Sequence, residues 1–125
     1  MALNLNRGKQ EHLGVLTIAN TGTESTIMTS DEFAAFATIG VYGPEALTGT
    51  VTLEFLRNPT ADETVATNWK TAQSPPGTNV EIPAGTCVVL NTASLPTNGI
   101  RVVSSGAEGA ERVFDVIGAR ASVTN

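Results

Sequence analysis

Residues 48–57, TGTVTLEFLR, carry the clearest pattern in the chain. Val51, Leu53 and Phe55 alternate with Thr52 and Glu54, so that apolar and polar side chains point to opposite faces of an extended strand. This alternation is typical of an antiparallel sheet that packs on a core with one face and meets water with the other. The segment therefore predicts a protein built of half-buried β-strands.

Similar short segments lie on both sides of residues 48–57, separated by glycine, proline and asparagine. We predict strands over residues 14–20, 25–29, 36–42, 67–72, 80–82, 86–90, 100–104 and 112–118. Residues 83–85, Pro-Ala-Gly, predict a hairpin between the segments 80–82 and 86–90. The one helical alternative is a turn starting at residues 30–32. The pattern predicts an all-β protein, an antiparallel β-sandwich of jelly-roll type.

One face of the predicted strands is consistently the more apolar, and its side chains should share one core. These are Val51, Leu53, Phe55, Ile82, Val88, Leu90, Ile100, Val102, Phe114 and Val116. In the last strand, Val113 and Ile117 offer a competing apolar face.

The length of 125 residues fits one domain. Residues 1–13 are polar and weakly patterned, with only Leu3 and Leu5 alternating with polar residues. We predict an N-terminal arm over residues 1–13 and a single β-sandwich domain over residues 14–125. The arm has no apolar stretch typical of a signal peptide, and no segment approaches the roughly 20 apolar residues of a membrane helix.

The charge pattern bears on possible partners. The net charge is −5, and the seven Lys and Arg residues are scattered along the chain. Proteins that bind nucleic acids or lipid surfaces present clustered basic residues, which this sequence lacks. We therefore expect neither a nucleic acid nor a membrane as a partner. The single cysteine permits no disulfide within the chain, which fits a reducing compartment.

Few side chains are available for chemistry. His12 is the only histidine and Cys87 the only cysteine, too few for a catalytic triad or a zinc site. We expect Cys87 to be a buried thiol in a strand and His12 to be solvated. No motif marks a catalytic residue, a metal ligand or a cofactor site, and we predict that the protein is not an enzyme. Trp69 and Tyr42 are the candidates for a sugar-binding surface.

An ordered series of motifs marks the second half of the chain. It comprises Trp69-Lys70-Thr71, residues 74–77 (SPPG), residues 80–85 (VEIPAG) and residues 99–106 (GIRVVSSG). The series resembles the small β-sandwich decoration, or cement, proteins of tailed bacteriophage capsids. The resemblance implies a virion structural protein on the capsid exterior, made in the host cytoplasm. It also implies the major capsid protein as partner, and a homo-oligomer on the shell.

The arm and two strand residues are the candidate contacts with such a partner. Leu3, Leu5 and Leu13 would bury against it, Arg7 and Lys9 would pair with acidic groups, and Trp69 and Arg101 are further interface candidates. A solvated charge is the alternative for Arg101. A tail, neck or fibre module of a phage and a carbohydrate- or ligand-binding sandwich remain open as alternative functions.

Overall fold

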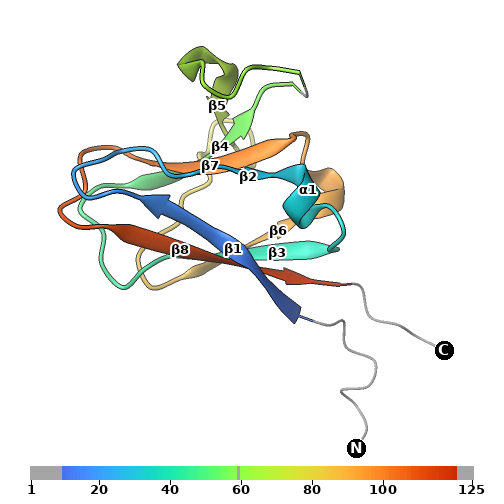
Figure 1. Ribbon diagram of the computed structural model, residues 1–125, viewed down its shortest axis with the longest axis horizontal. Helices are drawn as coiled ribbons and strands as arrows, with labels where there is room; N and C mark the ends of the chain where they lie inside the picture. The colour runs from blue at the N-terminus through green and yellow to red at the C-terminus, as the bar shows by residue number, and fades with distance from the viewer. Residues whose placement is uncertain (1–9, 59, 121–125) are drawn as a thin grey trace, which may run out of the picture.

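The computed structural model describes residues 10–58 and 60–120. It contains two four-stranded antiparallel sheets that pack face to face (Figure 1). Sheet A has the order β1 (Gln10–Ile18), β8 (Arg112–Ala119), β3 (Thr38–Tyr42) and β6 (Cys87–Asn91). Sheet B has the order β2 (Met28–Thr29), β7 (Gly99–Ser104), β4 (Val51–Leu56) and β5 (Trp69–Thr71).

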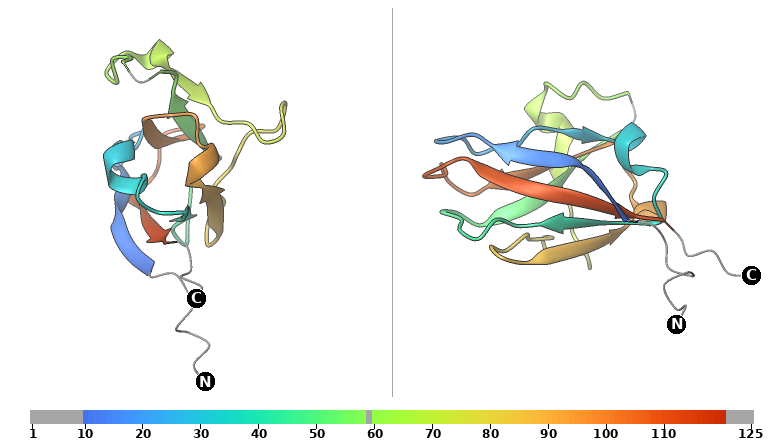
Figure 2. Two further views of the ribbon diagram at one scale, coloured as in Figure 1. Left: turned by 90° about the vertical axis from the view of Figure 1, so that its right-hand side faces the viewer. Right: turned by 60° about the horizontal axis from the view of Figure 1, so that its bottom comes forward.

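The connections define a jelly roll. Successive strands alternate between the two sheets, except that β4 and β5 are neighbours in sheet B. This is the wrapped order of an eight-stranded jelly roll, so the predicted fold class is confirmed. The described helices are single turns: α1 (Ser30–Phe33), η2 (Ala66–Asn68) and η3 (Thr92–Ser94). Figure 2 shows the two sheets closing around a common interior.

The core lies between the sheets, where the sequence pattern placed it. Of the ten predicted core residues, all but three are buried; Phe55, Val88 and Leu90 are half-buried and pack against the core. In β8, Phe114 and Val116 point inward and Val113 points outward. The face with Phe114 and Val116 is therefore the core face of this strand, as predicted. Further core residues come mainly from the first third of the chain: Leu16, Ile18, Met28, Phe33, Ile39, Val41 and Ala72.

The predicted hairpin around residues 83–85 is wrong. The Ile82 N–H donates to the Val51 carbonyl at 2.9 Å, and the Leu53 N–H donates to the Val80 carbonyl at 2.9 Å, so residues 80–82 lie beside β4 in sheet B. The strand β6 instead pairs with β3 in sheet A. Residues 83–85 therefore lead from one sheet to the other. A glycine-containing loop marks a change of direction but does not decide which strands pair.

The strand β1 begins at Gln10, before the expected domain boundary at Gly14. Its residues Gln10 to His12 pair with β8, and a register shift follows between His12 and Gly14. Leu13 is half-buried and packs against the core, so the structure assigns it to the domain and not to an arm. The remaining arm residues 1–9 lie outside the described part of the chain.

Glu108 ties three connections together at one end of the sandwich. Its side chain is 1% exposed and accepts four hydrogen bonds. Oε1 accepts from the Thr48 N–H and Arg112 Nε, both at 2.8 Å, and Oε2 accepts from the Gly49 N–H at 2.9 Å and the Ser104 hydroxyl at 2.6 Å. Its backbone also pairs with the turn at residues 20–22. Burial raises the pKa of Glu108, but the hydrogen bonds outweigh burial and lower it to about 2.

Candidate binding surface

The outward side of sheet A carries most of the large apolar side chains that are exposed among the described residues. Val15, Tyr42, Val89 and Val113 are 40%, 46%, 68% and 38% exposed, and all four lie on strands of this sheet. We call this surface, together with half-buried Ile117, the sheet A face. Side chains that alternate along each strand point to the same side, and the strand pairing aligns them into rows. Several exposed apolar side chains gathered on one face are typical of an interaction site.

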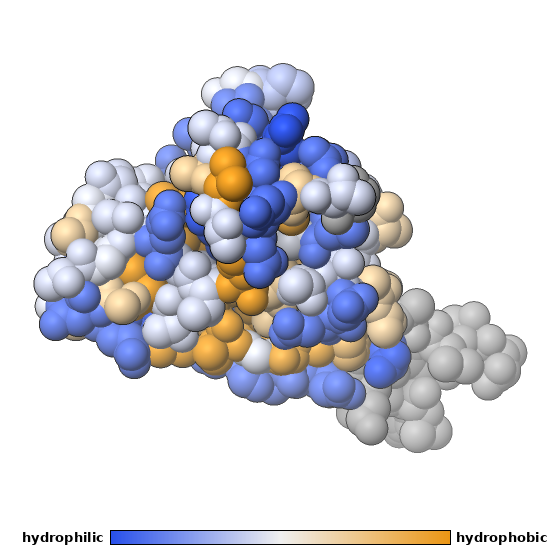
Figure 3. All heavy atoms as spheres, turned by 45° about the horizontal axis from the view of Figure 1, so that its top comes forward, coloured by the Kyte–Doolittle hydropathy of each residue, from blue (hydrophilic) through white to orange (hydrophobic). Residues whose placement is uncertain are grey.

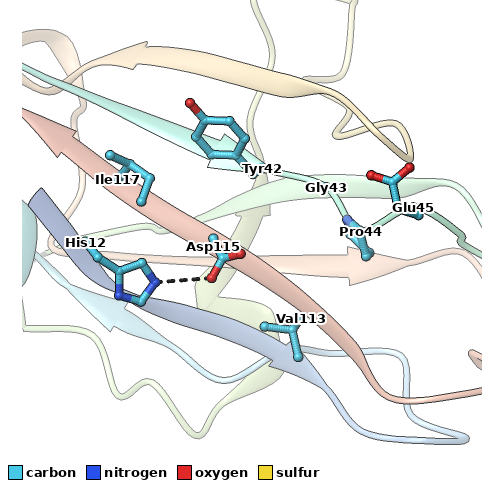
Figure 4. Close-up of a pocket in the computed structure, with 8 residues that line it drawn as sticks. All are labelled: His12, Tyr42, Gly43, Pro44, Glu45, Val113, Asp115 and Ile117. Carbon is cyan, nitrogen blue, oxygen red and sulfur yellow. Dashed lines mark hydrogen bonds and ion pairs between the residues drawn. The ribbon is translucent and has the colours of Figure 1, made fainter. Parts of the chain in front are cut away.

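A pocket of about 530 Å³ opens on this face (Figure 4). Val113, Asp115 and Ile117 of β8 form its floor, and Tyr42 and Pro44 form one side. His12 lies across β8 from Tyr42. Its Nε2 atom is 3.1 Å from Asp115 Oδ1, and both side chains are about half exposed. His12 is thus solvated, as predicted. The pocket combines aliphatic surface, one phenol ring, one exposed hydrogen bond between His12 and Asp115, and the Glu45 side chain, and can hold polar or apolar groups of a partner.

Cys87 is exposed, contrary to the prediction of a buried thiol. The alternation along β6 was predicted correctly, but Cys87 points to the outward side of sheet A, opposite Tyr42 of β3. A hydrogen bond with Cys87 and the charge interaction with it raise the pKa of Tyr42 above its ordinary value. Gly40 lies one row away, and a Cβ atom there would come within 2.9 Å of the sulfur. The space that the Cys87 and Tyr42 side chains occupy is therefore open only because residue 40 has no side chain.

Trp69 and Arg101 lie together on the outward side of sheet B. Arg101 is 7% exposed and places its guanidinium carbon 4.5 Å from the centre of the Trp69 ring. It bonds Glu54 at 2.9 Å and approaches Glu24 at 3.4 Å. Trp69 is 4% exposed, and its indole N–H donates to the Glu63 carbonyl. Trp69 therefore holds the 60–68 loop onto sheet B, and both residues present little surface to a partner.

The structure describes three of the seven predicted contact residues. Arg101 is not a solvated charge, because Glu54 and Trp69 enclose it. Leu13, Trp69 and Arg101 contribute to packing within the domain. Leu3, Leu5, Arg7 and Lys9 lie outside the described residues, and their role as partner contacts stays a prediction. The sequence signal for the sheet A face was present in the competing apolar face of β8, where Val113 and Ile117 alternate with the core residues.

Figure 3 brings forward the upper part of the molecule in Figure 1, with β4, β7 and the 60–68 loop. Hydrophilic and hydrophobic residues are interspersed on the face that it shows. Over residues 10–58 and 60–120, no three His, Cys, Asp or Glu side chains are grouped as metal ligands. None of the described helices is long and apolar enough to cross a membrane.

Comparisons of the chain with protein-family models, with characterised proteins and with solved structures found no match.

Proposed function

We propose that the protein is a structural component of a virus particle, a capsid decoration protein that binds the major capsid protein through the sheet A face. The observation that carries the proposal is the concentration of exposed apolar side chains on one face of a small rigid jelly roll. A protein that stabilises a shell needs such a face, because covering joints between subunits adds buried apolar area without any chemical step. The motif series that resembles decoration proteins supports the same function.

Covering the sheet A face with a protein partner would also be favourable, because this face exposes apolar side chains to water. The exposed side chains are those of Val15, Tyr42, Val89 and Val113. Each Å² of apolar area that a partner removes from water contributes about 25 cal/mol to the free energy of binding. The His12–Asp115 pair in the middle of this face adds hydrogen-bonding groups that fix the register of a partner.

Particle binding tests this function. Val113→Asp places a charge in the sheet A face, and Val65→Asp is the matched control, since Val65 is 43% exposed in the 60–68 loop. We expect the Val113→Asp protein to remain folded but to lose co-sedimentation with phage heads that lack the protein, while the Val65→Asp protein still binds. If the two variants bind equally well, the sheet A face is not the contact. If the unaltered protein binds only tail, neck or fibre fractions, it is a module of that part of the particle.

A carbohydrate-binding role is the second candidate, and the position of Tyr42 favours it. Its ring is 46% exposed beside Asp115 and Glu45 in the pocket of Figure 4, an arrangement of ring and carboxylates that suits a sugar. Trp69 does not contribute, because it is 4% exposed. Glycan-array binding that is lost in Tyr42→Ala and unchanged in Val65→Asp would establish this function in place of the first.

A further inference from the structure

The edge of sheet A at β6 has backbone groups free to pair. The Gly43 N–H donates to the Thr86 carbonyl at 2.8 Å, and the Thr92 N–H donates to the Ala37 carbonyl at 3.1 Å. Hydrogen-bonded pairs alternate along an antiparallel ladder, so residues 86, 88, 90 and 92 bond to β3. Cys87 and Val89 therefore direct their N–H and C=O groups away from the sheet, and no described residue pairs with them there.

Nothing in β6 protects this edge. Proteins usually block an exposed edge strand with a lysine, a proline, a bulge or a covering segment. The sequence of β6, CVVLN, contains no charge and no proline, and its pairing with β3 is regular. At the opposite edge of sheet A, by contrast, residues 24–26 cover the end of β1, where the Thr26 N–H donates to the Thr17 carbonyl at 3.0 Å. The open edge of β6 is thus ready to accept a further strand.

A groove of about 370 Å³ runs beside this edge, between the two sheets. Phe55, Val80, Leu90 and Leu95 line it; these are half-buried apolar residues that pack against the core and leave part of their surface in the groove. None of the residues that line the groove is charged, although the chain carries a net charge of −5. A strand added to β6 would place alternate side chains in this groove, where apolar side chains would pack against Phe55, Val80 and Leu90.

The groove admits a single extended segment more readily than a whole domain. Gln73, Ser74 and Val80 line it opposite Val89 and Leu90 of β6. The left view of Figure 2 shows residues 73–80, in yellow-green to yellow, standing out from the sandwich on the side of β6. The groove therefore lies between this loop and β6. The occupant must be narrow, uncharged and apolar at every second residue.

Residues 2–6 of this chain, ALNLN, have this composition. They carry no charge, and Leu3 and Leu5 alternate with Asn4 and Asn6. We propose that the Ala2–Asn6 segment of one copy adds a strand to the β6 edge of a second copy, with both leucines in the groove. This assigns the two leucines to a second copy of the protein and not to the capsid. The proposal does not depend on the capsid function.

The spacing of the strands favours a second copy over the same chain. Gln10, Ala119, Thr38 and Asn91 form one row across sheet A, so a strand added at β6 lies four strand spacings from β1, about 19 Å away. The five residues from Leu5 to Gln10 span at most about 18 Å when fully extended. Within one chain, Leu5 would reach the groove only with residues 5–10 almost fully extended across the end of sheet A, whereas a second copy imposes no such constraint.

The expected contact is small. A five-residue strand with two leucines buries far less than the roughly 1,600 Å² of a standard interface, so isolated copies should associate weakly. Copies held side by side on a surface would gain from a high effective concentration, and the same contact would then link them.

Sedimentation of the full-length protein tests the proposal, at concentrations from about 1 µM to about 1 mM. We expect reversible self-association that the double variant Leu3→Asp/Leu5→Asp abolishes. Asn4→Asp is the matched control, because it adds a charge in the same segment at a position that faces away from the groove; it should associate like the unaltered protein. Val89→Pro should also abolish association, since it removes an outward N–H and breaks no hydrogen bond to β3. Circular dichroism of each variant checks that the fold is intact.

Three results would overturn the proposal. The first is a protein that stays monomeric over the whole range. The second is association that persists in the leucine double variant, which would indicate direct pairing of two β6 edges or contact between sheet A faces. The third is equal loss in Asn4→Asp and in the double variant, which would show a general effect of charge. If Val89→Pro fails to fold, Val89→Lys takes its place, with the same expected loss.

Discussion

Replacing Glu108 with glutamine keeps the size of the side chain and removes its charge. Glutamine has one acceptor oxygen and an NH₂ group in place of the second oxygen. If the NH₂ group takes the position of Oε2, the Ser104 hydroxyl can rotate to accept from it, but the Gly49 N–H then faces a donor. In the other orientation, both the Thr48 N–H and Arg112 Nε lose their acceptor. At least one backbone N–H is therefore left unpaired in either case.

The magnitude follows from these contacts. An unpaired buried N–H costs about 1–3 kcal/mol. The hydrogen bond from Arg112 also becomes weaker by about 1 kcal/mol, because its acceptor is no longer charged. We expect Glu108→Gln to lower the free energy of unfolding by about 3 kcal/mol. Glu111→Gln, an exposed acid in the same turn, should change it by less than about 0.5 kcal/mol.

Equilibrium unfolding in urea measures both variants, with the fluorescence of Trp69, the only tryptophan, as the signal. The midpoint should fall for Glu108→Gln while the slope stays that of the unaltered protein, because the area exposed on unfolding does not change. A loss below about 1 kcal/mol, or one equal to that of Glu111→Gln, would refute the view that this carboxylate holds the three connections together.

Further predictions concern pH, the core and the buried ion pair. Because the pKa of Glu108 is about 2 in the folded protein against 4.5 ordinarily, its contribution of up to about 3 kcal/mol is complete above pH 4.5. That contribution should disappear as the pH falls toward 2, and acid titrations of stability should show this loss in the unaltered protein but not in Glu108→Gln. Phe114→Ala should cost about 3–5 kcal/mol in urea unfolding, because Phe114 is fully buried, and Phe55→Ala about half as much, since Phe55 is half-buried; equal losses would contradict the core assignment. Arg101→Ala should cost about 3 kcal/mol by leaving the partly buried Glu54 unpaired, and combining it with Glu54→Ala should recover part of the loss in a double-mutant cycle.

Local patterns in the sequence determined the fold class and most of the core. Alternation in residues 48–57 and its neighbours requires a sheet with one buried face, and the strands over residues 100–104 and 112–118 appear where they were predicted. The physical reason is that successive side chains of a strand point to opposite faces, so burial leaves a period of two in the sequence. That period identified the inward side of most predicted strands, whereas in residues 112–118 both sides were apolar and the structure decided between them.

Only the tertiary structure decided which strands pair and what covers their outward sides. Residues 80–82 and 86–90 are close in sequence but belong to different sheets, because pairing depends on how the whole chain wraps. Arg101 occupies an outward position like that of an exposed residue, yet Trp69 and Glu54 enclose it. Cys87 and Val89 remain exposed at the open edge of sheet A. A period of two assigns a side chain to one face of a strand, whereas the long-range contacts of that face set its exposure, and with it the surfaces available to a partner.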